Sequence, residues 1–198
     1  MFSESVQFTL LVSPQLTWNL AQHSVASNLF KPLSKITCKK FADGKDPLVR
    51  IVIQRVSEAS VSIKGNKISE IGPGLLILLG IESIDDQSDI DWLIRKVINM
   101  RIFDDEDGKM NLSLRDNYNE ALVVSQFTLH ASTKKGNRPS FIKAAPPAIS
   151  KPLYQSFCET LSREIGHPIE RGRFGVMMEV ALVNDGPVTI IIDSRNRE

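Results

Sequence analysis

"VNDGPVTI" (residues 183–190) separates two apolar stretches, MMEVAL before it and TIIID after it. Both stretches predict β-strands, because they are apolar and contain few helix-favouring features. The segment between them, from Asn184 to Pro187, consists of four consecutive turn formers, so we expect a turn between two strands. The proline raises a question, because an Asn-Asp-Gly turn is sufficient and a proline at the start of a strand removes one backbone donor.

The composition excludes several classes of protein. The chain has 198 residues, of which 42% are hydrophobic and 24% charged, as in ordinary soluble globular proteins. No apolar run approaches the roughly 20 residues that cross a bilayer, so no membrane span is expected. The formal net charge of +1 lacks the basic excess of many nucleic-acid binders. The two cysteines have no motif spacing, which favours a reducing compartment, and the three histidines predict no metal site. No cofactor is expected.

Residues 1–48 form an extension that differs from residues 49–198, which we interpret as one domain. The extension has five lysines, no arginine and three acidic residues, and it shows no sustained periodicity. Three interpretations stay open: a transit peptide, a disordered arm, or upstream sequence that the natural protein lacks. The protein is expected in the cytoplasm, with organellar import if the extension is a transit peptide.

The start of the domain predicts strands. RIVIQRV (50–56) has the alternating pattern of a β-strand. The hairpin signal Lys64-Gly65-Asn66 lies between two further strand-like segments, SVSI (60–63) and KISEI (67–71). The continuous apolar run LLILLGI (75–81) predicts a strand that is buried on both faces. A further strand is predicted for ALVVSQFTL (121–129).

Two helices are predicted. Residues 85–100 have acidic residues in the first turn and basic residues toward the C-terminal end, an arrangement that the helix dipole favours. The second helix begins near Pro147 and is expected to end at Gly166, with Cys158 in the core. Its apolar residues recur every four positions: Ile149, Leu153, Phe157, Leu161 and Ile165. The order of these elements predicts an α/β domain of mixed type with a substantial antiparallel component.

Catalytic signatures are sparse, since the sequence has no GxSxG, P-loop or GxGxxG motif. DDEDGKM (104–110) fails the EF-hand spacing. Ser125 and Thr128 are either nucleophiles or local hydrogen-bonding residues, and Thr128 shares a strand face with His130 only if that strand continues. A small basic loop either is solvated or meets phosphates: Lys134, Lys135 and Arg138.

Six segments, in this order, resemble the D-aminoacyl-tRNA deacylase family over residues 49–193: IQRVSEASV, GPGLLILLGI, RIFDDEDGKMN, VVSQFTLHA, RPSF and GRFGVMMEVALVNDGPVT. The pair SQFTL and NDGPVT, about sixty residues apart, is highly specific. The resemblance implies a β-barrel-like mixed sheet core with two main helices, working as a homodimer on aminoacyl-tRNA.

The resemblance also implies a site. The Gly186-Pro187 bond is expected to be cis and to enter the pocket of the dimer partner, where main chain excludes L side chains but admits D-amino acids and glycine. Arg55 and Met177 are assigned with this pair to substrate binding and chiral selection. Four residues are assigned to catalysis: Ser125, Gln126, Phe127 and Thr128. Backbone N–H groups near Phe127 and Thr128 would stabilise the oxyanion, with the 2′-hydroxyl of the terminal adenosine assisting. The alternative makes Thr128 a nucleophile.

The sequence is therefore interpreted as an enzyme that hydrolyses the ester of D-aminoacyl-tRNA and of mischarged glycyl-tRNA, releasing the amino acid and free tRNA. This activity is chiral proofreading in translation. The alternatives are a noncatalytic RNA-binding dimer, a relaxed relative that edits L-alanine mischarged onto tRNA, and a conventional Ser/Thr esterase.

Overall fold

The computed structural model describes residues 49–195, so the predictions for the extension lie outside the described residues. The elements are, in chain order, β1 (Arg50–Ile63), β2 (Asn66–Ile71), β3 (Gly74–Gly80), α1 (Gln87–Asn99), β4 (Phe103–Asp104), β5 (Met110–Leu112), β6 (Glu120–Ser125), the 3-10 turn η1 (Phe127–His130), α2 (Pro147–Ile165), β7 (Glu170–Arg171) and β8 (Glu179–Asp193).

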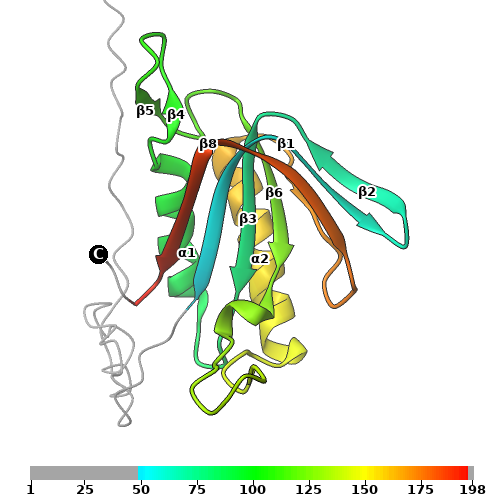
Figure 1. Ribbon diagram of the computed structural model, residues 1–198. Coiled ribbons are helices and arrows are strands. Elements are labelled where there is room, and N and C mark those ends of the chain that lie inside the picture. Colours follow the sequence, from blue (N-terminus) through cyan, green and yellow to red (C-terminus); the bar gives the residue numbers. More distant parts are fainter. Residues whose placement is uncertain (1–48, 196–198) are drawn as a thin grey trace, which may run out of the picture. The chain divides into compact units, whose positions relative to one another are not determined.

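Strand β1 is the centre of a six-stranded mixed sheet (Figure 1). The order is β2-β1-β3-β6-β7, and β8 also pairs with β1. The first half of β1 pairs with β3 and its second half with β2, so one long strand replaces the two that were predicted. Strands β2, β3 and β8 run antiparallel to β1, whereas β3, β6 and β7 run parallel to one another. The predicted mixed fold with an antiparallel component is confirmed.

The predicted hairpin between β1 and β2 is also present. Lys64 and Gly65 both have positive φ, at 52° and 77°. Two such residues in succession match the right-handed twist of the flanking strands.

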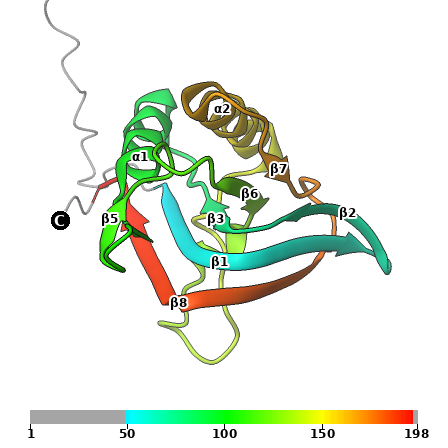
Figure 2. The ribbon, with the colours of Figure 1, turned by 90° about the horizontal axis from the view of Figure 1, so that it is seen from above.

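Strand β3 is buried on both faces, as its apolar run predicted. Leu75 and Ile77 face the core beneath the helices, while Leu76 belongs to a second core on the other face. The second core lies inside the curl of the sheet and includes Val61 and Leu122. Figure 2 shows the sheet curling into a nearly closed, barrel-like arrangement, with both helices on one side.

The two helices have the expected boundaries and cover the same face of the sheet (Figure 2). The Asp86 side chain caps α1 and accepts from Ser88 N at 2.8 Å. Gly166, at φ 81°, ends α2 in the left-handed conformation. Phe157 and Leu161 are fully buried, whereas Ile149 at the start of the predicted stripe is 37% exposed. No helix in residues 49–195 has the length and apolarity that a membrane span requires.

The predicted turn between two strands at "VNDGPVTI" is wrong, because β8 is one continuous strand. Both of its halves pair with β1 and not with each other. Gln54 pairs with Thr189 and Val56 with Asn184, so two steps along β1 match five steps along β8. The additional residues of β8, around Gly186, form a bulge that bends the strand without reversing it.

The predicted strand at residues 121–129 ends early. Strand β6 stops at Ser125, which pairs with Leu79 at the end of β3. Phe127–His130 form the turn η1 in place of the last part of the predicted strand.

Candidate active site

A cavity of about 630 Å³ opens where the parallel strands β3 and β6 end. Its walls come from the end of β3, from η1, from the start of α2 and from residues 174–180. The carboxyl ends of parallel strands are a common ligand-binding position in open sheets.

The structure brings four predicted catalytic residues together on one wall of this cavity. They are Ser125, Gln126, Phe127 and Thr128. The backbone N–H of Gln126 donates to Leu79 O at 2.8 Å, and the chain then turns into η1. The Gln126 side-chain amide donates to the Thr128 hydroxyl. A neutral amide does not activate a hydroxyl as a nucleophile, so this wall offers mainly backbone and amide groups.

His130 does not act with Thr128, because η1 is not extended and the two residues share no strand face. The His130 side chain is buried behind the turn, with Nδ1 3.4 Å from Glu82 Oε1. Burial lowers the pKa of His130 below its ordinary value. Within residues 49–195 no hydrogen bond links His130 to Ser125 or Thr128. A Ser-His or Thr-His pair is therefore absent from the described cavity.

The helix α2 supplies a wall that the sequence analysis missed. Ser150 and Tyr154 both line the cavity. Their spacing of four on a predicted helix was the available signal. The Tyr154 hydroxyl donates to Val123 O at 2.9 Å, and burial raises the pKa of this phenol. Tyr154 therefore keeps its proton and links α2 to β6. Cys158 is 1% exposed, as expected of a core residue, and burial raises the pKa of its thiol to about 11.

The mouth of the cavity is apolar. Met177, a predicted substrate-binding residue, lines it and is 89% exposed. Phe174 and Met178 line it as well, and the sequence analysis did not assign them. The Phe127 ring meets the Phe141 ring edge-on, with centroids 5.1 Å apart. The apolar run in GRFGVMM was the signal for this wall.

Gly186 and Pro187 lie outside this cavity, in the bulge of β8, and are exposed. Their peptide bond is cis, as the resemblance implied. Arg55 Nε lies 3.4 Å from the Asp185 carbonyl oxygen and 3.0 Å from Asp185 Oδ2. The Asn184 amide donates to Arg55 O at 3.1 Å and to Val188 O at 3.0 Å. The bulge is thus tied to β1 at its base.

Gly186 has no room for a side chain. Its φ is +115°, and a β-carbon there would lie 3.0 Å from Arg55 Nη2 and 2.9 Å from Val188 Cγ2. Arg55 cannot give way easily, because it is 6% exposed and its Nη1 donates to Ile102 O at 2.7 Å. Backbone alone therefore forms the surface of the bulge at Gly186.

The predicted site residues consequently fall into two groups at opposite ends of β3. Arg55 pairs with Leu75 near the start of β3, and Ser125 pairs with Leu79 near its end. At about 3.3 Å per residue, these positions are about 13 Å apart along the strand. In Figure 1 the bend of β8 lies at the upper end of the sheet and the turn after β6 at the lower end. One chain does not bring the two groups together.

An exposed basic loop follows η1. Ser132 N donates to Ser140 O at 2.8 Å, and Ser140 N donates to Ser132 O at 2.9 Å, which closes the base of the loop. Its cations are Lys134, Lys135 and Arg138. Among residues 49–195, no group of three or more His, Cys, Asp or Glu is placed to hold a metal ion.

The chain is similar to known proteins over the whole described domain. The profile of the D-Tyr-tRNA(Tyr) deacylase family matches residues 52–193. A D-aminoacyl-tRNA deacylase of Bacteroides thetaiotaomicron is 62% identical over 150 residues, which cover 76% of this chain and 100% of that protein. The same coverage holds for a D-aminoacyl-tRNA deacylase of Porphyromonas gingivalis, at 61% identity.

Solved structures agree with the fold. One, described as "c-Myc DNA Unwinding Element Binding Protein", is 43% identical, with a TM-score of 0.67 over 72% of this chain and 97% of that chain. Another, described as a "probable eukaryotic D-amino acid tRNA deacylase", is 18% identical and shares the fold, with a TM-score of 0.64 over 74% of this chain and 99% of that chain. The family profile and the relatives together show that the chain belongs to the D-aminoacyl-tRNA deacylase family.

Proposed function

We propose that this chain hydrolyses the ester bond between a D-amino acid, or mischarged glycine, and tRNA. The observation that carries the proposal is the wall of the cavity at η1. Within residues 49–195, this wall presents backbone and amide groups, and no hydroxyl on it is paired with a general base. An aminoacyl ester is already activated, so hydrolysis needs oxyanion stabilisation more than a strong nucleophile. Family membership supports the same substrate class.

Catalysis is assigned to the start of η1. The first N–H groups of a helical turn have no acceptor inside that turn, so those of Phe127 and Thr128 are available to a developing oxyanion. The 2′-hydroxyl of the terminal adenosine then assists the attack of water. The Thr128 hydroxyl, which accepts from Gln126, takes no covalent part.

Chiral selection is assigned to the bulge of β8 from a second copy of the chain. The bulge is exposed, rigidly held by Arg55, and free of side chains at Gly186. The backbone of the bulge would collide with the side chain of any bound L-amino acid. The side chain of a D-amino acid points away from this backbone, and glycine has no side chain. Because this bulge lies at the other end of β3 from the cavity, a homodimer is the arrangement that joins them.

The tRNA is proposed to lie along the basic loop beside the cavity. Lys134, Lys135 and Arg138 are exposed and follow η1 directly. Cations of this kind position a nucleic acid through its phosphates without requiring a strongly basic protein.

Side-by-side hydrolysis of D-Tyr-tRNA and L-Tyr-tRNA tests the proposed function. We expect release of D-tyrosine and glycine from tRNA and no release of L-tyrosine. Equal rates for the two tyrosine enantiomers contradict chiral selection. Binding without hydrolysis supports a noncatalytic RNA-binding dimer instead, and preferred hydrolysis of L-Ala-tRNA supports the relaxed editing relative.

A mixing experiment tests the shared site. Phe127→Pro removes a backbone N–H on one wall, and Gly186→Val obstructs the bulge. Each variant alone is expected to be inactive. If each site combines the turn of one subunit with the bulge of the other, a mixed dimer has one intact site, so re-equilibrated mixtures regain roughly a quarter of the activity. No recovery in mixtures shown to contain mixed dimers places both groups in one subunit.

A further inference from the structure

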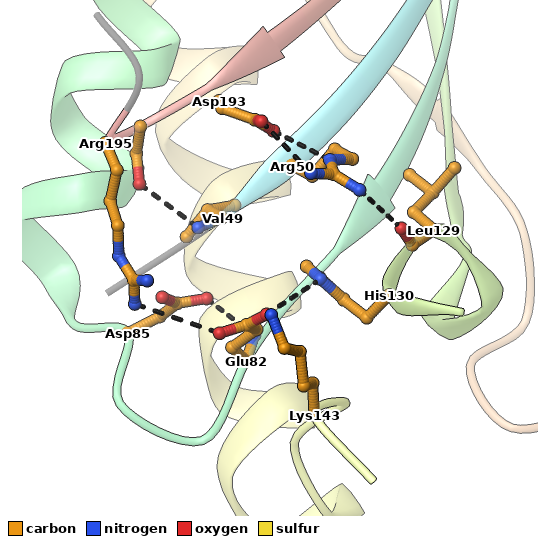
Figure 3. A network of polar contacts seen from close by, with 10 residues as sticks. Val49, Arg50, Glu82, Asp85, Leu129, His130, Lys143, Asp193 and Arg195 are labelled. Carbon is orange, nitrogen blue, oxygen red and sulfur yellow. Dashed lines mark hydrogen bonds and ion pairs between the residues drawn. The ribbon is translucent and has the colours of Figure 1, made fainter. Parts of the chain in front are cut away.

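A buried polar cluster lies behind the cavity, around the Glu82 carboxylate at the end of β3 (Figure 3). Glu82 is 6% exposed and His130 3% exposed. His130 Nδ1 lies 3.4 Å from Glu82 Oε1, and Lys143 Nζ lies 3.9 Å from the same oxygen. Arg195 Nη2 lies 3.8 Å from Glu82 Oε2. One carboxylate thus meets three segments that are far apart in the sequence.

The residues of this cluster adjoin residues of the cavity wall. Glu82 follows Ile81, Lys143 precedes Ala144, and both Ile81 and Ala144 line the cavity. Ala145 N donates to Ile81 O at 2.9 Å, so the two segments are also joined by main chain. His130 is the last residue of η1, whose first residues carry the proposed catalytic N–H groups. The cluster and the cavity wall therefore share the same segments of the chain.

The turn η1 is seated tightly on the end of β3. A β-carbon at Gly80 would lie 2.9 Å from His130 Nε2 and 3.0 Å from Gln126 O. Arg50 Nη1 donates to Leu129 O at 2.9 Å (Figure 3). Arg50 itself is held by Asp193, with Nε 2.8 Å from Oδ1 and Nη2 3.1 Å from Oδ2. The orientation of η1 is thus fixed from behind by groups that do not line the cavity.

The Glu82 carboxylate is buried and its three basic partners lie at the outer range of ion-pair distances. Burying a charge is costly, and partners at 3.4 to 3.9 Å return little of that cost unless the geometry is close to ideal. Burial lowers the pKa of His130 and Arg50 acts in the same direction, whereas a hydrogen bond with the Gly80 main chain and the charges of Glu82 and Asp193 oppose the shift. His130 Nδ1 and Glu82 Oε1 form no hydrogen bond at 3.4 Å, so the two side chains meet as a buried polar contact.

We propose that Glu82 is a positioning residue for the deacylation reaction, acting through His130 to set the orientation of the turn η1. This inference rests on the proposed function of η1. Neither residue touches the substrate. Their joint role is to hold the backbone N–H groups of Phe127 and Thr128 where the oxyanion develops, because such donors lose most of their effect when they are misplaced.

A double-mutant cycle on turnover tests the proposal in the full-length protein. The variants are Glu82→Ala, His130→Ala and the double variant, assayed with D-Tyr-tRNA. Each single variant is expected to lower kcat about tenfold or more and to change KM less than about twofold, because the interaction matters mainly in the transition state. The kcat of the double variant is expected to be no lower than that of the slower single variant, because both substitutions remove the same contact between Glu82 and His130.

Matched controls separate positioning from general loss of stability. Glu164→Ala removes a carboxylate that pairs with Arg115 at 2.9 Å, and His167→Ala removes an imidazole after α2. Both are expected to keep kcat within about twofold of the unmodified protein. If Glu82→Ala does not fold, Glu82→Gln and His130→Gln replace the alanine variants in the same cycle.

Three outcomes overturn the inference: unchanged kcat in folded variants, a rise in KM at constant kcat, or additive effects in the double variant. Any of them leaves the proposed function intact if the unmodified protein hydrolyses D-Tyr-tRNA. Failure of the unmodified protein and of the two controls to hydrolyse it overturns the proposed function instead.

Discussion

Arg55 and Asp185 are joined twice, since Arg55 Nε lies 3.0 Å from the Asp185 carboxylate and 3.4 Å from its carbonyl oxygen. The planar guanidinium also donates to Ile102 O at 2.7 Å. It therefore holds the residue immediately before Gly186 against the side of β1. A lysine provides a single point charge and cannot satisfy these acceptors together.

Arg55→Lys is expected to lower the free energy of unfolding by about 1–3 kcal/mol, because the buried carbonyl oxygen of Ile102 loses its donor. It is also expected to lower D-Tyr-tRNA hydrolysis by loosening the bulge. Urea unfolding and kcat/KM measure the two effects. Arg115→Lys is the control, because Arg115 is a more exposed partner of Glu164. Equal stability of the two variants contradicts the role assigned to Arg55.

Phe127→Pro and Phe127→Ala separate backbone from side chain at the start of η1. Proline is tolerated at the first position of a helical turn but removes its N–H. If that N–H stabilises the oxyanion, Phe127→Pro lowers kcat about 10²–10³-fold. Phe127→Ala keeps the N–H, so its kcat should fall much less than that of Phe127→Pro. Similar kcat values for the two folded variants show that the N–H does not contribute.

Thr128→Ala distinguishes the two chemical mechanisms. The Thr128 hydroxyl accepts from the Gln126 amide and meets no base within residues 49–195, so its removal should retain most of the activity. A D-aminoacyl-tRNA ending in 2′-deoxyadenosine, with the amino acid on the 3′ oxygen, should lose most of it. Complete inactivity of folded Thr128→Ala protein, with activity on the deoxy substrate, favours the covalent alternative.

The stability of the protein should depend on pH through His130. Its pKa is lowered, chiefly by burial, so below about pH 6.5 the unfolded chain binds a proton that the folded protein resists. The free energy of unfolding therefore falls as the pH falls from about 6.5 through the lowered pKa. His130→Gln should show a smaller fall between about pH 7.5 and about pH 5.5 in urea titrations. An identical fall in both proteins assigns the effect to other groups.

The sequence alone determined those features that depend on local pattern. The seven apolar residues of β3 predicted a strand buried on both faces, since neither face carries polar side chains. The apolar periodicity of α2 and Gly166 after it predicted the helix and its end. The segments SQFTL and NDGPVT indicated the family, and with it the two groups of site residues.

Only the tertiary structure decided how those residues are arranged, because pairing partners are not encoded locally. The turn formers around Gly186 became a bulge, since both halves of β8 pair with β1. Strand β6 ended at Ser125, and the turn η1 that follows it placed its own last residue, His130, next to Glu82. These two residues are 48 positions apart, and their contact depends on the packing of η1 against Gly80, which no local pattern predicts.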